Sequence, residues 1–119
     1  MKTLLKQYFG YDEFRPLQEE IINNVLAGKD SFVLMPTGGG KSLCYQLPAL
    51  KFNGITLVVS PLIALMKDQV DGLKACGIKA EFINSSLLPA QIGEIRARAK
   101  NNDIKILYLA PERFAAGNF

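Results

Sequence analysis

The sequence contains no histidine and only two cysteines, Cys44 and Cys76, among its 119 residues. The absence of histidine excludes histidine-based catalytic triads and histidine-ligated metals. Two cysteines at this spacing fit neither a metal-ligand motif nor a disulfide framework, so we expect a reducing, intracellular compartment. No apolar run reaches the roughly 18 residues of a membrane-spanning helix, and Gln7 and Asp12 interrupt the start of the chain. We therefore expect neither a transmembrane segment nor a signal peptide.

The composition otherwise indicates one folded domain. Apolar residues make up 49% of the chain and charged residues 21%, which are ordinary values for a globular protein. The net charge of +3 permits a polyanionic partner without requiring one. The sequence has no internal repeat and no low-complexity segment, so we expect a single core.

Apolar residues alternate between helical and strand-like spacing along the chain. This pattern favours an α/β fold with a mostly parallel sheet flanked by helices. Buried strands are predicted at residues 31–35 and 55–59, and further strands at 78–83 and 104–109. Helices are predicted near residues 4–8, 17–26, 41–50, 62–73 and 92–99.

Individual residues predict details of these helices. Pro16 suits a first helical position, and Gly28 suits a helix stop. Between them, apolar residues at helical spacing predict one buried face, formed by Leu17, Ile21, Ile22, Val25 and Leu26. Pro48 is expected to kink or end the helix that contains it. The basic residues at 96–100 are expected to form only a solvated helix face.

The strongest local signal is the segment Met35-Pro36-Thr37-Gly38-Gly39-Gly40-Lys41-Ser42, between a predicted buried strand and a predicted helix. That context is typical of a phosphate-binding loop. The three glycines let the backbone turn tightly and present its N–H groups to phosphate oxygens. Lys41 would contact the outer phosphates of a nucleotide, and the Ser42 hydroxyl would hold Mg²⁺. Met35 replaces the usual first glycine, and a glycine-rich turn that merely joins strand to helix is the alternative.

Four segments resemble, in order, the motifs of RecQ-type superfamily 2 DNA helicases. FGYDEFRPLQEEII resembles motif 0, MPTGGGKSLCYQLPA motif I, VVSPLIALMKDQV motif Ia and ILYLAPER motif Ib, and together they span about residues 9–113. The resemblance implies a P-loop NTPase fold of the RecA-like type, with residues 1–119 forming the first part of the first motor domain. Motif II, which supplies an acid pair, and the second motor domain are absent, and motif II is expected beyond residue 119.

The resemblance also assigns roles at the nucleotide site. Lys41 and Ser42 are the expected catalytic residues, with Ser42 as the metal ligand, and the phosphates would be bound by Thr37, Gly38, Gly39, Gly40, Lys41 and Ser42. Gln18 would read the adenine edge through its amide, while Tyr11 and Arg15 hold the base. Periodicity alone would instead make Gln18 a solvated helix residue, and Tyr11 also suits a hydrophobic staple before the helix.

Motif Ia and motif Ib supply the expected DNA contacts. The resemblance implies that Ser60, Pro61 and Lys67 contact the backbone of single-stranded DNA. Ser60 and Pro61 follow a predicted strand, at a junction where helix N–H groups can meet a phosphate. Ser60 also suits a helix N-cap, and Lys67 an exposed helical lysine. Arg113 would either touch the DNA backbone or brace the sheet edge.

Together these features predict the ATP-binding portion of an ATP-dependent 3′-to-5′ DNA helicase that uses ATP and Mg²⁺ and acts in DNA repair or recombination. The 119 residues alone are expected to be inactive, because the catalytic acid pair is missing. The alternatives are a nucleotide- or DNA-binding module without catalysis, and another P-loop enzyme such as a small-molecule kinase. We expect a cytoplasmic, nucleoid-associated location in a bacterium or a nuclear one in a eukaryote. We also expect self-association through an unpaired sheet edge.

Overall fold

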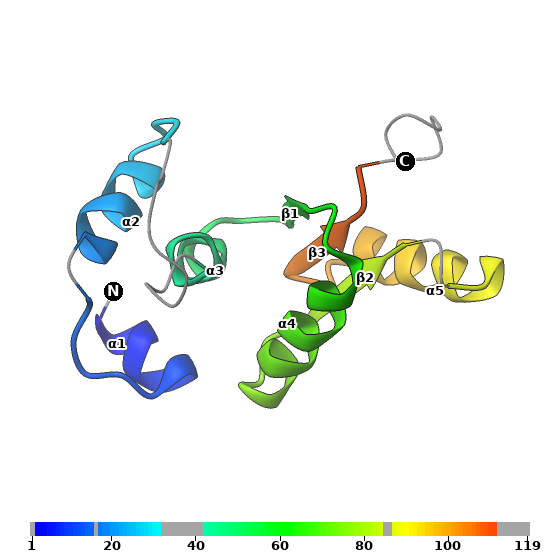
Figure 1. Cartoon of the computed structure of the whole chain (residues 1–119), viewed down its shortest axis with the longest axis horizontal. Helices are drawn as coiled ribbons and strands as arrows, with labels where there is room; N and C mark the ends of the chain where they lie inside the picture. Colours follow the sequence, from blue (N-terminus) through cyan, green and yellow to red (C-terminus); the bar gives the residue numbers. More distant parts are fainter. Residues whose placement is uncertain (1, 16, 32–41, 85–86, 112–119) are drawn as a thin grey trace. The chain divides into compact units, whose positions relative to one another are not determined.

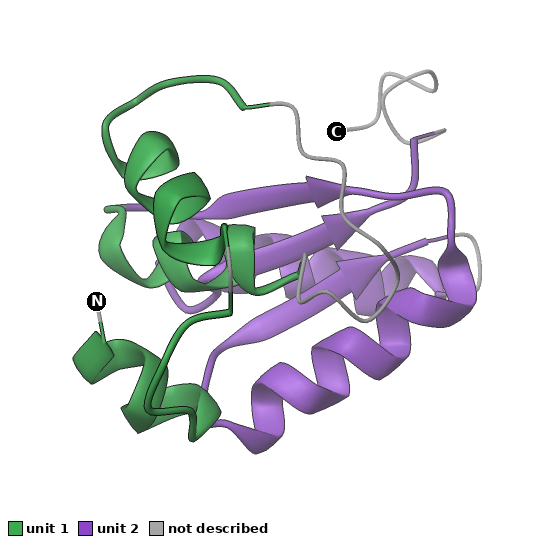
Figure 2. Ribbon diagram, turned by 60° about the vertical axis from the view of Figure 1, so that its left-hand side comes forward, with its two compact units in different colours: residues 1–53 green, residues 54–119 purple. Residues whose placement is uncertain are grey.

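The computed structural model describes residues 2–15, 17–31, 42–84 and 87–111. The chain divides into two compact units, Met1–Asn53 and Gly54–Phe119 (Figure 2). Each unit has its own cluster of buried apolar side chains. Within the described ranges, no helix is long and apolar enough to cross a membrane.

The described part of unit 1 is helical (Figure 1). It contains α1 (Lys2–Leu4), the π-helical turn η1 (Leu5–Phe9), α2 (Gln18–Leu26) and α3 (Leu43–Lys51). Helices α2 and α3 pack against each other. The centre of the unit is a cluster of buried side chains, namely Leu5, Ile22, Leu43 and Leu47. The predicted helices at 4–8, 17–26 and 41–50 are thus present, with shifted ends.

Helix α2 corrects the predicted position of Leu17. This residue does not join the buried face: it precedes the helix, has a φ of 72°, and is 59% exposed. A left-handed backbone at Leu17 turns the chain before Gln18, so the helical spacing of the apolar residues does not extend back to it. Pro16, predicted at the first helical position, lies outside the described residues. Gly28 has a φ of 81° just after the helix, which confirms the predicted stop.

Helix α3 continues for one turn past Pro48 and ends at Lys51. The N–H of Phe52 donates to the Pro48 carbonyl over 3.1 Å, so the final turn is hydrogen-bonded despite the proline. Pro48 itself is fully buried. Its ring therefore contributes to the packing of the helix end.

Unit 2 is a parallel sheet with helical crossovers (Figure 1). The chain runs through β1 (Thr56–Val59), α4 (Ile63–Ala75), β2 (Ala80–Ile83), α5 (Pro89–Lys100) and β3 (Ile106–Leu109). The strand order is β1-β3-β2, and β3 pairs in parallel with both neighbours. The predicted strands at 55–59, 78–83 and 104–109 are confirmed in this arrangement. The predicted strand at 31–35 lies, except for Ser31, outside the described residues.

The interior of unit 2 is centred on β3, whose four residues are all buried. Leu107 and Leu109 of β3 pack with Ile83 of β2 and Ile95 of α5. Helix α4 contacts β2 and buries Met66, Val70 and Leu73. A central strand covered by crossover helices is what a parallel sheet requires.

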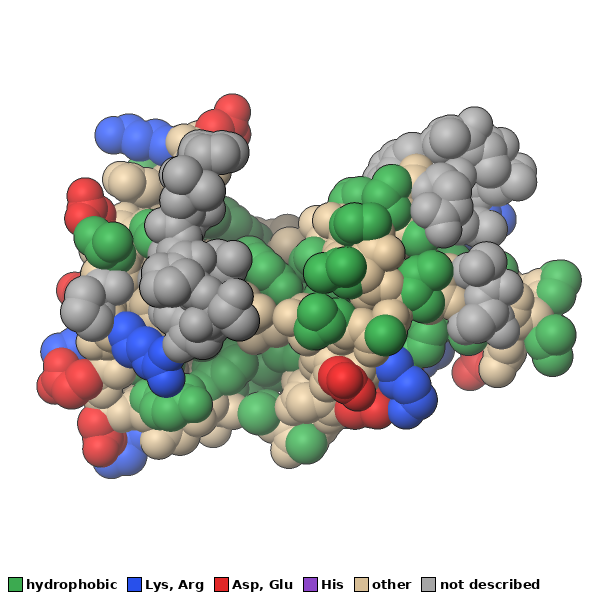
Figure 3. All heavy atoms as spheres, in the orientation of Figure 1, with side chains coloured by type: hydrophobic (Ala, Val, Ile, Leu, Met, Phe, Trp, Pro, Cys, Tyr) green, Lys and Arg blue, Asp and Glu red, His purple; other side chains and the backbone are tan. Residues whose placement is uncertain are grey.

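Strand β1 is less buried than predicted. Residues 55–59 were expected to be a buried strand, but Ile55, Leu57 and Val59 are 38%, 41% and 51% exposed. The cause is the strand order: β1 is an edge of the described sheet, and the apolar cluster under α5 reaches only β2 and β3. Figure 3 shows apolar side chains on the surface around β1. We call Ile55, Leu57 and Val59 the β1 apolar strip.

The opposite edge, at β2, carries charges. Glu81 of β2 is bound by Lys74, from the last turn of α4, and by Arg98, from the last turn of α5. Arg98 Nε also lies 3.5 Å from Asp103, which pairs with Lys79 Nζ at 2.9 Å. We call these five residues the β2 charge network. Arg98 therefore does more than form a solvated face, because it joins α5 to β2.

Candidate functional site

The predicted phosphate loop is described only at its last residue. Thr37, Gly38, Gly39, Gly40 and Lys41 lie outside the described residues, and Ser42 lies inside them. The Ser42 carbonyl accepts hydrogen bonds from the N–H groups of Tyr45 and Gln46, over 3.3 and 2.9 Å. Helix α3 therefore begins directly after Ser42, as a phosphate loop requires. The half-buried Ser42 lies at the positive end of a nine-residue helix, which suits an anion and a hydroxyl-bound cation.

The start of α2 places Gln18 in a closed turn. The Gln18 N–H donates to the Arg15 carbonyl over 3.1 Å, and the Arg15 N–H donates to Gln18 Oε1 over 2.7 Å. Gln18 is only 3% exposed, so the interpretation as a solvated helix residue is wrong. Its side chain closes the turn that Leu17 forms in the left-handed region. The Oε1 atom has a second lone pair, so accepting from Arg15 does not prevent it from accepting from a base.

The other two predicted adenine-site residues lie in the same stretch of chain. Tyr11 is 56% exposed, which does not fit a ring buried as a hydrophobic staple. Arg15 is also exposed, while its backbone is fixed by Gln18. Sequence reasoning missed the positive φ of Leu17, because a positive φ is expected mainly at glycine and a leucine gives no signal for it.

Ser60 lies at the carboxyl end of β1, the edge at which open α/β sheets bind ligands. Its N–H donates to the Leu109 carbonyl of β3 over 3.0 Å, which fixes the residue to the sheet. Its Oγ accepts from the Leu62 N–H over 3.2 Å, so Ser60 holds the turn that leads into α4. Pro61 is exposed beside it. The predicted N-cap role of Ser60 is wrong, because the N-cap of α4 is Leu62; the Ser60 hydroxyl instead holds the turn just before the helix.

The same sheet edge carries the start of motif Ib. Strands β1 and β3 are in register, with Val59 opposite Leu109. The residues that follow, Ser60 and Ala110, therefore leave the sheet side by side. Pro111 comes next and is exposed, whereas Arg113 lies outside the described residues. Parallel pairing thus brings motif Ia and motif Ib to one edge.

Lys67 lies on the exposed side of α4, with its side chain 68% exposed. Its Nζ is 2.8 Å from Asp71 Oδ2, one turn further along the helix. The hydrogen bond that Lys67 donates to Asp71, and the charge of Asp71, raise the pKa of the Lys67 ammonium, with a smaller contribution from the charge of Asp68. Lys67 is therefore fully charged at neutral pH, and it already has an anionic partner.

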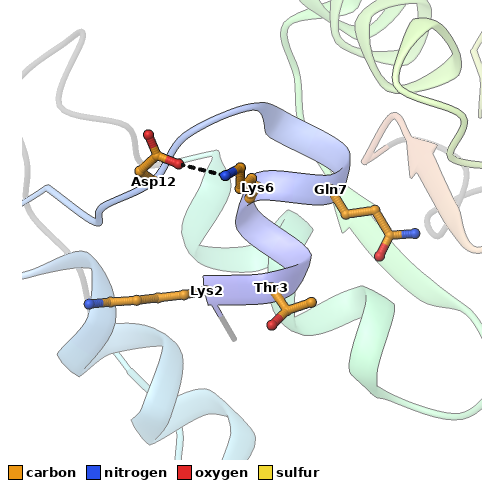
Figure 4. Close-up of a pocket in the computed structure, with 5 residues that line it drawn as sticks. All are labelled: Lys2, Thr3, Lys6, Gln7 and Asp12. Carbon is orange, nitrogen blue, oxygen red and sulfur yellow. Dashed lines mark ion pairs between the residues drawn. The ribbon is translucent and has the colours of Figure 1, made fainter.

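Unit 1 also has an open surface hollow of about 420 Å³ (Figure 4). It is lined by Lys2, Thr3, Lys6, Gln7 and Asp12. Lys6 pairs with Asp12 at 3.5 Å, while Lys2 pairs with Glu13 at 3.4 Å. None of these residues was predicted to bind a ligand. Over the part of the chain that the structure describes, no group of three acidic or cysteine side chains is placed to hold a metal ion.

Comparison with known proteins extends these observations. The family model described as DEAD/DEAH box helicase matches residues 15–119. The chain is 52% identical over 117 residues to a protein named ATP-dependent DNA helicase RecQ from Haemophilus influenzae, covering 98% of this chain and 19% of that protein. The protein of the same name from Bacillus subtilis is 49% identical over 119 residues, covering 99% of this chain and 20% of that protein.

A relative with a different name agrees. The ATP-dependent DNA helicase Q1 of Mus musculus is 49% identical over 117 residues, covering 97% of this chain and 18% of that protein. The chain thus spans about a fifth of the length of these relatives. A solved structure titled as a hypothetical ATP-dependent RNA helicase from Sulfolobus tokodaii has a TM-score of 0.76 and 24% identity, covering all of this chain and 38% of that one. At this identity the likeness concerns the fold alone.

Proposed function

The chain belongs to the DEAD/DEAH box helicase family, and on this basis we propose that it is the ATP-binding part of an ATP-dependent DNA helicase motor. The family match confirms the predicted P-loop NTPase fold, and the resemblance to RecQ helicases is confirmed by the relatives near 50% identity. The activity of the whole protein is proposed to be 3′-to-5′ unwinding of duplex DNA driven by ATP hydrolysis, serving DNA repair or recombination.

One observation carries this proposal. The similarity to proteins named ATP-dependent DNA helicase RecQ extends over 98% of the chain and is not confined to the glycine-rich loop. A shared phosphate loop alone would also fit a small-molecule kinase. The similarity includes the turn at Gln18 and the junction at Ser60, which a kinase has no need of.

The geometry at Ser42 and Gln18 fits a nucleotide. We propose that Lys41 and the loop N–H groups bind the phosphates, that the Ser42 hydroxyl holds Mg²⁺, and that Gln18 orients the base. The bound ion would neutralise charge on the outer phosphates. The buried turn holds the Gln18 amide in one position before a ligand arrives, which lowers the entropy cost of binding. Tyr11 and Arg15, both exposed, would hold the faces of the base.

The DNA surface is proposed to lie at the carboxyl edge of the sheet in unit 2. Ser60 and Pro61 enter it from β1, and the motif Ib residues that include Arg113 enter it from β3. With Lys67 these groups would contact phosphates and no base edges, so DNA binding would be independent of sequence. Binding would also weaken steeply with added salt.

We propose that residues 1–119 form the first part of the first motor domain, with motif II and the second motor domain elsewhere in the full natural protein. These residues alone are proposed to bind nucleotide or DNA without catalysis, and to self-associate through the β1 edge. The exposed β1 apolar strip supports that last point. A location with the DNA, in the bacterial nucleoid region or the eukaryotic nucleus, follows from the proposed substrate.

The test is Lys41→Ala in the full natural protein, with Lys51→Ala as the matched control. Lys51 is an exposed lysine at the far end of α3, so its loss removes the same charge away from the loop. We expect Lys41→Ala to abolish DNA-stimulated ATP hydrolysis and the unwinding of a 3′-tailed duplex, and Lys51→Ala to leave both unchanged. Retained hydrolysis in Lys41→Ala would refute the loop assignment. A parent protein that binds DNA but never hydrolyses ATP would favour the non-catalytic binding module.

A further inference from the structure

We propose that Asp71 is a built-in counter-ion of the DNA surface, which competes with DNA phosphate for Lys67 and so weakens DNA binding. This inference rests on the proposed function, in which Lys67 contacts DNA. Asp71 belongs to none of the site residues discussed for that function. Its role would be to limit how tightly the motor holds a strand along which it must move.

The pair is close and accessible. Lys67 Nζ and Asp71 Oδ2 are 2.8 Å apart, and the two side chains are 68% and 55% exposed. A phosphate can therefore reach Lys67 without any rearrangement of the core. Since the carboxylate and a phosphate both bind the ammonium through oxygen atoms, only one of them can hold it in a close ion pair at a time.

Helix stability gives only a weak reason for this pair. In a helix, the favourable order of an i,i+4 pair places the acidic residue before the basic one, and here Lys67 precedes Asp71. Helical side chains also lean toward the N-terminus of their helix. When Lys67 leaves Asp71 it therefore extends along α4 toward Ser60, which is the proposed phosphate-binding end.

The charges set the sign of the effect. A lysine ammonium keeps its proton at neutral pH beside either anion, so the exchange is one ion pair for another. An exposed pair of this kind shifts an equilibrium by about twofold. When DNA displaces Asp71, the freed carboxylate also gathers cations, which offsets part of the cation release from the DNA. Asp71 should thus lower both the affinity and its salt dependence.

The experiment compares Asp71→Asn with Asp68→Asn in the full natural protein. Asp68 is an exposed neighbour of Asp71, and the described structure records no ion pair for it. Asp68→Asn therefore serves as the control, because it removes the same charge from the same helix. Binding of a fluorescent oligo-dT strand is measured by anisotropy across a salt series, with each change made alone and together with Lys67→Ala. Asp71 is exposed, so the substitutions are expected to leave the fold intact.

We expect Asp71→Asn to tighten binding about twofold more than Asp68→Asn, and to steepen the slope of log affinity against log salt by up to about 0.7. Both effects should vanish in the Lys67→Ala background. Equal behaviour of the two variants, or an Asp71 effect that persists without Lys67, would overturn the inference alone. If Lys67→Ala leaves binding unchanged, both the inference and the DNA contact of Lys67 are wrong. A parent that does not bind single-stranded DNA would refute the proposed function itself.

Discussion

Replacing Gln18 tests the described part of the proposed nucleotide site, because this side chain has two separable roles. Its Oε1 closes the turn at Arg15, and its amide is proposed to read adenine. Gln18→Ala removes both roles. Gln18→Glu keeps an acceptor for the Arg15 N–H but has no amide to donate to adenine N7.

The structure sets the size of the stability effect. Without Gln18, the part-buried Arg15 N–H loses its acceptor, which costs about 1 kcal/mol. The side chain is 3% exposed, so truncation to alanine also loses buried methylene packing worth about 1 kcal/mol. Gln18→Ala should therefore destabilise the fold by about 2 kcal/mol and lower the unfolding midpoint by about 5–10 °C.

Gln18→Glu should be much milder. The carboxylate still accepts from Arg15, and as the first residue of α2 it lies at the positive end of the helix. These gains offset most of the cost of burying a charge, so we expect stability within about 1 kcal/mol of the parent. Both variants should raise the Michaelis constant for ATP about tenfold and change that for GTP little.

The assays are thermal unfolding followed by circular dichroism, and DNA-stimulated hydrolysis of ATP and GTP. A Gln18→Ala variant that unfolds at the parent's temperature would show that the turn contributes no stability. Equal losses of ATP and GTP turnover in Gln18→Glu would refute the adenine-reading role. The two variants together thus separate folding from recognition.

Two further predictions concern titration and thiol chemistry. The Lys79 ammonium, and then Arg98, hold the pKa of the Asp103 carboxyl below its usual range, so Asp103 contributes stability that is present above about pH 4 and is lost as pH falls below it. In urea unfolding measured across pH, the free energy of unfolding of Asp103→Asn should fall less steeply below about pH 4 than that of the unsubstituted protein. An equally steep fall would contradict the pairing. Burial raises the pKa of the Cys44 thiol, so a thiol reagent at pH 8 should label half-buried Cys76 first, and equal rates would argue against the burial.

The elements with strong periodicity were predictable from the sequence. Helices α4 and α5 and the three described strands all overlap their predicted ranges, since residue spacing reports directly which side chains share a face. The start of α3 after Ser42 was predictable for another reason. A glycine run that ends in Lys-Ser has few structural contexts, and a helix follows in the phosphate-loop one.

Other features depend on information that spacing does not contain. Leu17 has the spacing of a face residue, but its backbone is left-handed, and side-chain patterns do not report φ. Gln18 can be buried because its Oε1 accepts a hydrogen bond from a backbone N–H three residues earlier, which residue spacing does not report. The exposure of β1 follows from the order β1-β3-β2, which is set by long-range pairing. Arg98 was predicted as solvated because Glu81 and Asp103 reach it only once the sheet has formed.

The two edges of the described unit 2 sheet differ in how readily they can pair with a further strand. At β2, Glu81 is bound by Lys74 and Arg98, and charged side chains on an edge strand disfavour pairing with another strand. At β1, the apolar side chains of Leu57 and Val59 are exposed, so covering them with another apolar surface is favourable. Any further strand of this sheet is therefore expected to pair with β1, where it would cover Leu57 and Val59.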